Sequence, residues 1–355
     1  PIFGPTNLKC LKKPTLPMLT NRNGHTCVQP EQLRDTWIDF FGQMEGGVRI
    51  SWEDLTAKWQ ASLETFQQHE IDLGPADLPS LTDLEMSFRR VKKGKALGPD
   101  GVPPELCKAC PALLARQYFT ALMKMIIHGQ ESLHHKGGTL VPAYKGKGPA
   151  TDPTSYRSLL ISSHMGKVLH RTIRQHQSTM YEQYLCAQQL GGRKKVPVTL
   201  GLHEARAFLR HGQQLGHSVG LIMVDLTEAF YRVLRPLAVG GQYSDEQIAQ
   251  IVHKLGMTSD TLHELHEHLR QPSAVDQACL PHHLKQVLRA LHTDTYFQIQ
   301  GQEDCCHTSV GSRPGDCFAD VVFSYLFSRV LKSFQRKLDE VGLQQRVAAT
   351  PTFDP

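Results

Sequence analysis

Apolar positions along the chain recur mostly at intervals of three and four, which is the spacing of one helix face. The clearest case begins at Ser80, where Asp83 three positions later predicts a capping box, and Leu84 and Phe88 continue the apolar stripe. Similar spacing predicts helices over 31–70, 111–128 and 318–341, and two or three more over 244–292. Short apolar or alternating runs predict strands over 138–145 and 295–300. Interspersed helices and strands predict an α/β (α+β) fold.

One apolar run differs from the others because it ends in a carboxylate. Val219 to Val224 is nearly all apolar and is followed by Asp225, a pattern typical of a strand buried on both faces. An isolated buried charge is costly, so such an Asp needs a partner, and its hard oxygens suit Mg²⁺. The alternative is that Asp225 caps a following helix.

Composition and charge leave the choice of partner open. Of 355 residues, 40% are hydrophobic and 21% charged, as in ordinary globular proteins. The net charge of +5 permits an anionic partner without requiring one. Basic residues cluster near positions 90 and 194. Basic residues at the C-terminal end of a helix also suit the helix dipole, so a solvated helix end explains the cluster near 90 equally well. The clustered residues are Arg89, Arg90, Lys92, Lys93, Arg193, Lys194 and Lys195.

The cysteines and the chain start bear on location. Nine cysteines form no disulfide framework, so we expect reduced thiols and a nuclear or cytoplasmic protein that is not secreted. No apolar run approaches the length of a membrane span. The chain begins at Pro1 without a Met, which we interpret as a segment of a longer polypeptide.

Three short motifs with metal-like spacing have simpler interpretations. Cys107 and Cys110 lack the second pair that a structural zinc site needs. We expect Cys305-Cys306-His307 to be an exposed hairpin tip. The histidines over 263–268 lack zinc-protease spacing and are expected to lie on a solvated helix face.

Five runs in one order give the most specific signal. In the first, Asp225 is followed by three residues and then by Ala229 and Phe230. In the second, Gly311-Ser312-Arg313-Pro314-Gly315-Asp316 precedes the predicted helix over 318–341. Three weaker runs lie at 95–103, 156–169 and 189–193. Together they resemble the reverse transcriptase domain of non-LTR retrotransposons, over roughly residues 85–330.

The resemblance implies a role for several residues. Asp225 would bind Mg²⁺ (or Mn²⁺), with the Leu226 carbonyl beside it, and Phe230 would exclude a ribose 2′-OH. Lys145 and Arg157 would hold the triphosphate of a dNTP, since cations neutralise the leaving pyrophosphate. The resemblance further places Arg313, Gly315 and Asp316 near the template, and the clustered basic residues on the nucleic-acid backbone. The expected partners are an RNA template, a DNA primer and a dNTP, and no membrane.

One essential box of the family is missing from the sequence. Two-metal nucleotidyl transfer onto a primer 3′-OH needs further carboxylates, which the family takes from an aromatic-x-Asp-Asp turn. This chain contains no Asp-Asp pair. We therefore expect the fingers and a partial palm of a right-hand polymerase over 81–345, with the thumb absent, a connector over 1–80 and a disordered tail over 346–355.

These observations leave three functions open. The first is an RNA-directed DNA polymerase module that is inactive as this chain alone. The second is a non-catalytic nucleic-acid-binding remnant of such an element. The third is the product of a decayed element without a selected role.

Overall fold

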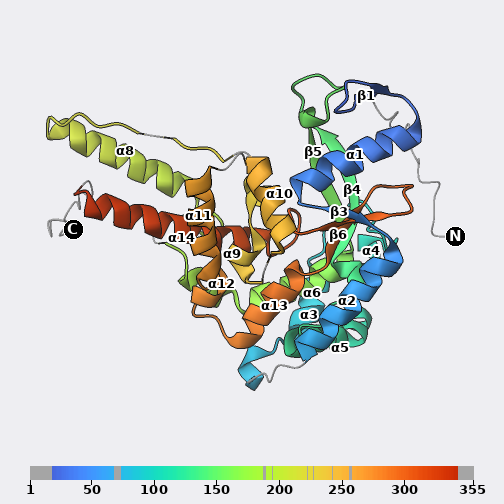
Figure 1. The fold of residues 1–355 in the computed structure, drawn as a ribbon. Helices are drawn as coiled ribbons and strands as arrows, with labels where there is room; N and C mark the ends of the chain where they lie inside the picture. Colours follow the sequence, from blue (N-terminus) through green and yellow to red (C-terminus); the bar gives the residue numbers. More distant parts are fainter. Residues whose placement is uncertain are drawn as a thin grey trace.

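The computed structural model describes residues 18–67, 73–186, 189–193, 195–221, 223–226, 228–241, 243–255 and 258–342. The fold is mixed α/β (Figure 1), with one five-stranded mixed sheet and one two-stranded sheet. The strands are β1 (Leu19–Thr20), β2 (Thr26–Cys27), β3 (Val48–Ile50), β4 (Gly137–Tyr144), β5 (Tyr156–Ser162), β6 (Thr295–Gln298) and β7 (Cys305–Thr308). The α-helices are α1 (Pro30–Met44), α2 (Trp52–Gln67), α3 (Leu81–Arg89), α4 (Pro104–Ala109), α5 (Pro111–His128), α6 (His164–His176), α7 (Ser178–Gln183), α8 (Val198–Gln214), α9 (Arg235–Val239), α10 (Asp245–Leu255), α11 (Ser259–Arg270), α12 (Ala274–Gln277), α13 (His282–His292) and α14 (Ala319–Glu340).

The larger sheet has the strand order β3-β7-β6-β4-β5. Its longest ladder joins β4 and β5 as an antiparallel hairpin, from Gly138 opposite Ser162 to Tyr144 opposite Tyr156. β4 and β6 pair in parallel, and the remaining neighbours pair antiparallel. Segments more than 100 residues apart in the chain therefore share one sheet.

Each face of this sheet is covered by a helix from the first 67 residues. Trp37 and Phe41 of α1 are buried in one cluster with Phe297, whereas Leu55 of α2 is buried in another with Tyr296. Neighbouring residues of a strand point to opposite faces, so α1 and α2 pack on the two sides. β3, between these helices, belongs to the same sheet. The expectation of a connector therefore does not describe residues 30–67, which are part of the core.

The hairpin tip expected at Cys305-Cys306-His307 was wrong. These residues form β7, and Cys305 and Cys306 are buried on opposite faces of the sheet. Their local sequence is not strongly apolar. Pairing with both β3 and β6 gives β7 a neighbouring strand on each side, so these residues are not at an exposed tip.

A second, helical core joins α3, α5, α6, α13 and the first half of α14. The predicted capping box is confirmed: Ser80 Oγ accepts from Asp83 N at 3.1 Å, and Asp83 Oδ2 accepts from Ser80 N at 2.8 Å. The helices predicted over 111–128 and 318–341 correspond to α5 and α14, and the strands predicted over 138–145 and 295–300 correspond to β4 and β6. The region 244–292 holds α10 to α13, of which α12 is a single turn.

The strand predicted from Val219 to Val224 was wrong. Residues 219–221 and 223–225 lie in no helix or strand, and Met223 and Val224 are 86% and 81% exposed. A strand buried on both faces needs a paired strand and two covering layers. The described part of the chain places no strand beside this run, and the side chains of Leu221, Met223 and Val224 are exposed.

The far half of α14 and the long helix α8 extend from the body of the molecule in the same direction (Figure 1). Among its described side chains α8 buries only Gly212, and Val330 and Phe334 of α14 are more than half exposed. Among the described residues, no helix is both long and apolar enough to cross a membrane.

Candidate nucleic-acid interface

Three of the five motif runs meet in space. The amide of Gly311 donates to Val233 O and that of Ser312 to Phe230 O, each at 2.8 Å. This joins the glycine run to η4, the 3₁₀ turn Ala229–Arg232 that follows Asp225. The Tyr231 hydroxyl is hydrogen-bonded to that of Ser158 in β5. The runs around 158, 230 and 311 are therefore in direct contact, although the sequence separates them by about 70 to 150 residues.

Glycine is required at the centre of this contact. Gly311 has φ 90°, a left-handed conformation that side chains rarely adopt, and a Cβ there would lie 3.3 Å from Phe230 O. Gly315 has φ 99° and is exposed, next to Leu160 O of β5. The exposed backbone at Gly315 is the part of the glycine run that a ligand could approach.

The template contacts expected for Arg313 and Asp316 are contradicted by burial. Arg313 is 5% exposed and donates to Leu291 O at 2.6 Å and to His135 O at 2.9 Å. The Asp316 side chain is 7% exposed and lies 2.7 Å from His170 Nδ1. Both side chains hold the turn onto the helical core and do not reach solvent.

His170 lies between two buried carboxylates. Its Nδ1 faces Asp316, and its Nε2 is hydrogen-bonded to Glu131. Burial disfavours a charge on the ring, but the attraction of Asp316 and Glu131 outweighs it and raises the pKa of His170 to about 9. Burial alone would raise the pKa of Glu131, yet His170 lowers it to about 2. This charged triad ties α6 to the turn that precedes α14.

Asp225 does not form a metal site with the described residues. It lies in an exposed loop, as does Leu226, and no group of three or more His, Cys, Asp or Glu side chains that could hold a metal ion occurs in the described ranges. The residues present therefore do not fit a two-metal centre. Phe230 is 37% exposed, and its ring packs edge-on against Phe323 of α14, with 5.3 Å between centroids.

Lys145 and Arg157 lie on one face of the β4–β5 hairpin. Arg157 is opposite Ala143, and Lys145 follows Ala143 by two positions, so the side chains share a face. Arg157 is exposed, and Lys145 Nζ donates to Thr154 O at 2.9 Å. The structure thus places the two cations expected to hold a triphosphate on one hairpin.

The clustered basic residues have different surroundings. Arg89 forms an ion pair with Glu85, and Arg193 donates to Leu185 O and Cys186 O. Lys93 and Lys195 are exposed, and Lys194 lies outside the described residues. Arg90 and Lys92 line a groove of about 540 Å³ between the end of α3 and the outer face of α6.

Three further cations line the same groove: Lys95, Lys167 and Arg171. None of the groove's five Lys and Arg side chains has a carboxylate within ion-pair distance in the described part of the chain. Burial lowers the pKa of Lys167, against the opposing effect of Asp316. The sequence reasoning did not single out these residues; the spacing of four between Lys167 and Arg171 was the available signal.

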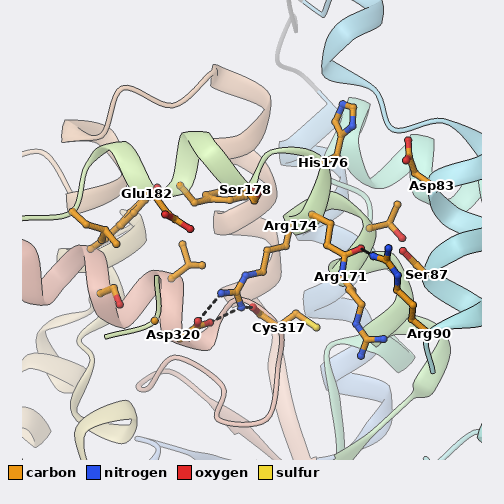
Figure 2. Close-up of a pocket in the computed structure, with 18 of the residues that line it drawn as sticks. Asp83, Ser87, Arg90, Arg171, Arg174, His176, Ser178, Glu182, Cys317 and Asp320 are labelled. Carbon is orange, nitrogen blue, oxygen red and sulfur yellow. Dashed lines mark hydrogen bonds and ion pairs between the residues drawn. The ribbon is translucent and has the colours of Figure 1, made fainter. Parts of the chain in front are cut away.

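A second cavity of about 740 Å³ adjoins this groove and shares Arg90, Arg171 and Gln175 with it (Figure 2). On its wall Arg174 donates to both oxygens of Asp320, at 2.7 and 2.6 Å. A chain of positive charge thus runs from the outer groove to the mouth of the cavity. A scan against protein-family models finds no match, and a search of curated proteins finds none either.

Proposed function

We propose that this chain is the nucleic-acid-binding part of a reverse-transcriptase-type polymerase, that it binds an RNA template strand along the α3–α6 groove, and that it does not polymerise by itself. The observation that carries the proposal is the groove, which five Lys and Arg side chains line and where none of the five has a carboxylate within ion-pair distance among the described residues. Unpaired cations gathered in one concave surface favour a polyanionic ligand.

The scaffold supports the assignment to a polymerase of this type. The motif runs around Ser158, Phe230 and Gly311 are in contact, as parts of one site would be. The Lys145 and Arg157 pair lies on the same hairpin as Ser158, and we propose it as the dNTP phosphate site. A single exposed Asp225 supplies too few ligands for Mg²⁺ or Mn²⁺ chemistry, so the proposed activity of this chain is binding.

Binding to single-stranded RNA is expected to depend steeply on salt. Five phosphate contacts would give a slope of log affinity against log salt of roughly −3 to −4. The measurement is fluorescence anisotropy of a 5′-labelled RNA of about 20 nucleotides, titrated at several salt concentrations.

A triple variant tests the groove directly. Replacing Lys92, Lys167 and Arg171 by Gln is expected to weaken binding by at least about tenfold at low salt and to reduce the slope by about two. The matched control replaces three exposed lysines outside the groove, Lys58, Lys108 and Lys337, by Gln and removes the same charge. Equal losses in both triple variants would show a general charge effect and contradict the groove.

Primer extension tests the second half of the proposal. The purified chain is incubated with a primed RNA template, dNTPs and Mg²⁺ or Mn²⁺, and no elongated primer is expected. Metal-dependent extension that is lost in Asp225→Ala would overturn the conclusion that this chain only binds.

A further inference from the structure

One face of α14 is apolar and only partly covered by the described part of the chain. Phe323, Phe327, Val330 and Phe334 recur at intervals of three and four, so they lie on one side of the helix. Val330 and Phe334 are more than half exposed, and this half of α14 projects from the body of the molecule (Figure 1). A contiguous exposed apolar surface of this kind marks a site of contact with a partner.

The inner part of this face forms one wall of a groove. The other wall is η4 with the residues beside it, and the groove has a volume of about 170 Å³. Its lining residues, among them Leu226, Val233, Leu326 and Val330, are all apolar except Arg232. An apolar cavity of about 150 Å³ is large enough for a benzene ring, so this groove has room for one bulky apolar side chain.

The shape and the lining of the groove favour a protein side chain over a nucleobase or a lipid surface. The ring of Phe323 is stacked on Phe327 and is in contact with Phe230, so these rings pack against one another and do not form an open platform for bases. Arg232 is the one side chain of the lining that could hydrogen-bond to the edge of a base. A concave groove receives a protruding side chain, whereas binding to a membrane surface requires an apolar face that itself enters the lipid.

The charge of α14 indicates the sign of the partner. Between positions 321 and 338 the helix contains no Asp or Glu and carries four cations, Arg329, Lys332, Arg336 and Lys337. None of the four has a carboxylate within ion-pair distance among the described residues. A helix is about 10–12 Å across and the Debye length is about 8 Å at physiological ionic strength, so all four act on a partner that lies along the apolar face. A second copy of this chain would bring the same cations and be repelled, whereas an acidic partner is attracted.

We propose that the groove between η4 and α14 binds an acidic amphipathic helix of a partner protein, which inserts one bulky apolar side chain into the groove and continues along the outer half of α14. The apolar face from Phe323 to Phe334 is roughly 16 Å long, which about three turns of a partner helix would cover. Recognition of this kind uses apolar anchors at i, i+3 or i+4, and i+7 of the bound helix. This surface contains no residue of the α3–α6 groove, so it does not depend on the proposed RNA site.

The test is fluorescence anisotropy of a labelled synthetic peptide of about 18 residues, with Leu along one helix face and Glu and Ala elsewhere, titrated with the whole chain. Saturable binding with a Kd below about 100 µM is expected. The same peptide with Lys in place of every Glu should bind at least about tenfold more weakly, because it meets the cations of α14. A scrambled peptide of the same composition, which has no apolar face, should bind as weakly.

Two variants locate the binding on the chain. Val330→Asp puts a charge into the apolar groove and should weaken binding of the Glu peptide by about tenfold or more. Its matched control is Val198→Asp on α8, which changes a valine that is 91% exposed and should bind the peptide like the parent. Arg336→Gln/Lys337→Gln should lower the affinity by about threefold and make it less dependent on salt. Because Val330, Arg336 and Lys337 are exposed, all three variants should melt close to the parent temperature.

Other occupants of this surface would give different results. No saturable binding of the Glu peptide, or equal binding by Val330→Asp and Val198→Asp, would overturn the proposal. Dimerisation in sedimentation that Val330→Asp abolishes would assign the groove to a second copy, and binding to phosphatidylserine vesicles that the same variant abolishes would assign it to a membrane; either result overturns the acidic helix. Val330→Asp is expected to keep the RNA affinity of the parent, and a loss of RNA binding there would assign this surface to RNA instead.

Discussion

Replacing His170 by Ala would leave two carboxylates buried without their shared cation. The side chains of Glu131 and Asp316 are 1% and 7% exposed, so neither gains full hydration when the imidazole is removed. Breaking a buried ion pair from one side costs about 3–5 kcal/mol. Lys136 and Arg313 lie 3.9 and 3.8 Å from the two carboxylates and offset part of the loss. We expect a destabilisation of about 3 kcal/mol near pH 6, a large fraction of a typical domain's stability.

The pH dependence gives a second estimate of the free energy that the charged His170 contributes to folding. The pKa of His170 is about 9 in the folded protein, against 6.5 for a free imidazole. A raised pKa stabilises the fold fully below 6.5, and this contribution is lost as the pH rises through 9. The shift corresponds to roughly 3 kcal/mol. Glu131 has the opposite sign: its pKa is lowered from 4.5 to about 2, so its contribution is present above 4.5 and is lost as the pH falls through 2.

The assay is urea unfolding followed by circular dichroism between pH 5.5 and 9.5. The parent chain should lose stability toward pH 9.5, whereas His170→Ala should start lower and change less over this range. The control is His263→Ala, which removes an exposed histidine of α11 and should follow the parent. A His170→Ala variant within about 1 kcal/mol of the parent at pH 6 would refute the reasoning, because breaking a buried ion pair from one side is expected to cost about 3–5 kcal/mol.

Two further substitutions test other parts of the structure. Arg235 is buried and donates to the carbonyl oxygens of His292, Thr308, Val310 and Gly311. A lysine cannot reach all of them, so Arg235→Lys should lower the free energy of unfolding by about 2–3 kcal/mol. An unchanged free energy of unfolding in urea would contradict the importance of this network. Asp225 is exposed, so Asp225→Ala should change the unfolding free energy by less than about 0.5 kcal/mol, and a larger loss would indicate a structural partner for this carboxylate.

The basic groove illustrates how far a residue pattern leads toward a site. The sequence pattern marked Arg90 and Lys92 as possible phosphate contacts. It marked Arg89 and Lys93 in the same way and could not separate the two pairs. In the structure Arg89 is neutralised by Glu85, one helical turn away. Lys167 and Arg171 join the groove because α6 packs beside α3, a contact that no local pattern predicts.

The sequence by itself determined the elements that depend on neighbours along the chain. The capping box at Ser80 and Asp83, the helices α5 and α14, and the strands β4 and β6 follow from spacing and turn chemistry over a few residues. Tertiary structure decided whatever depends on a partner far away in the chain. Leu221, Met223 and Val224 before Asp225 pair with no strand in the described part of the chain and are exposed, whereas Cys305 and Cys306 are buried in a strand that β3 and β6 flank. Arg313 is buried because it donates hydrogen bonds to the carbonyl oxygens of Leu291 and His135, and Asp316 is buried because it is hydrogen-bonded to His170. Burial and charge pairing are sums over long-range contacts, and a local pattern of residues does not contain those contacts.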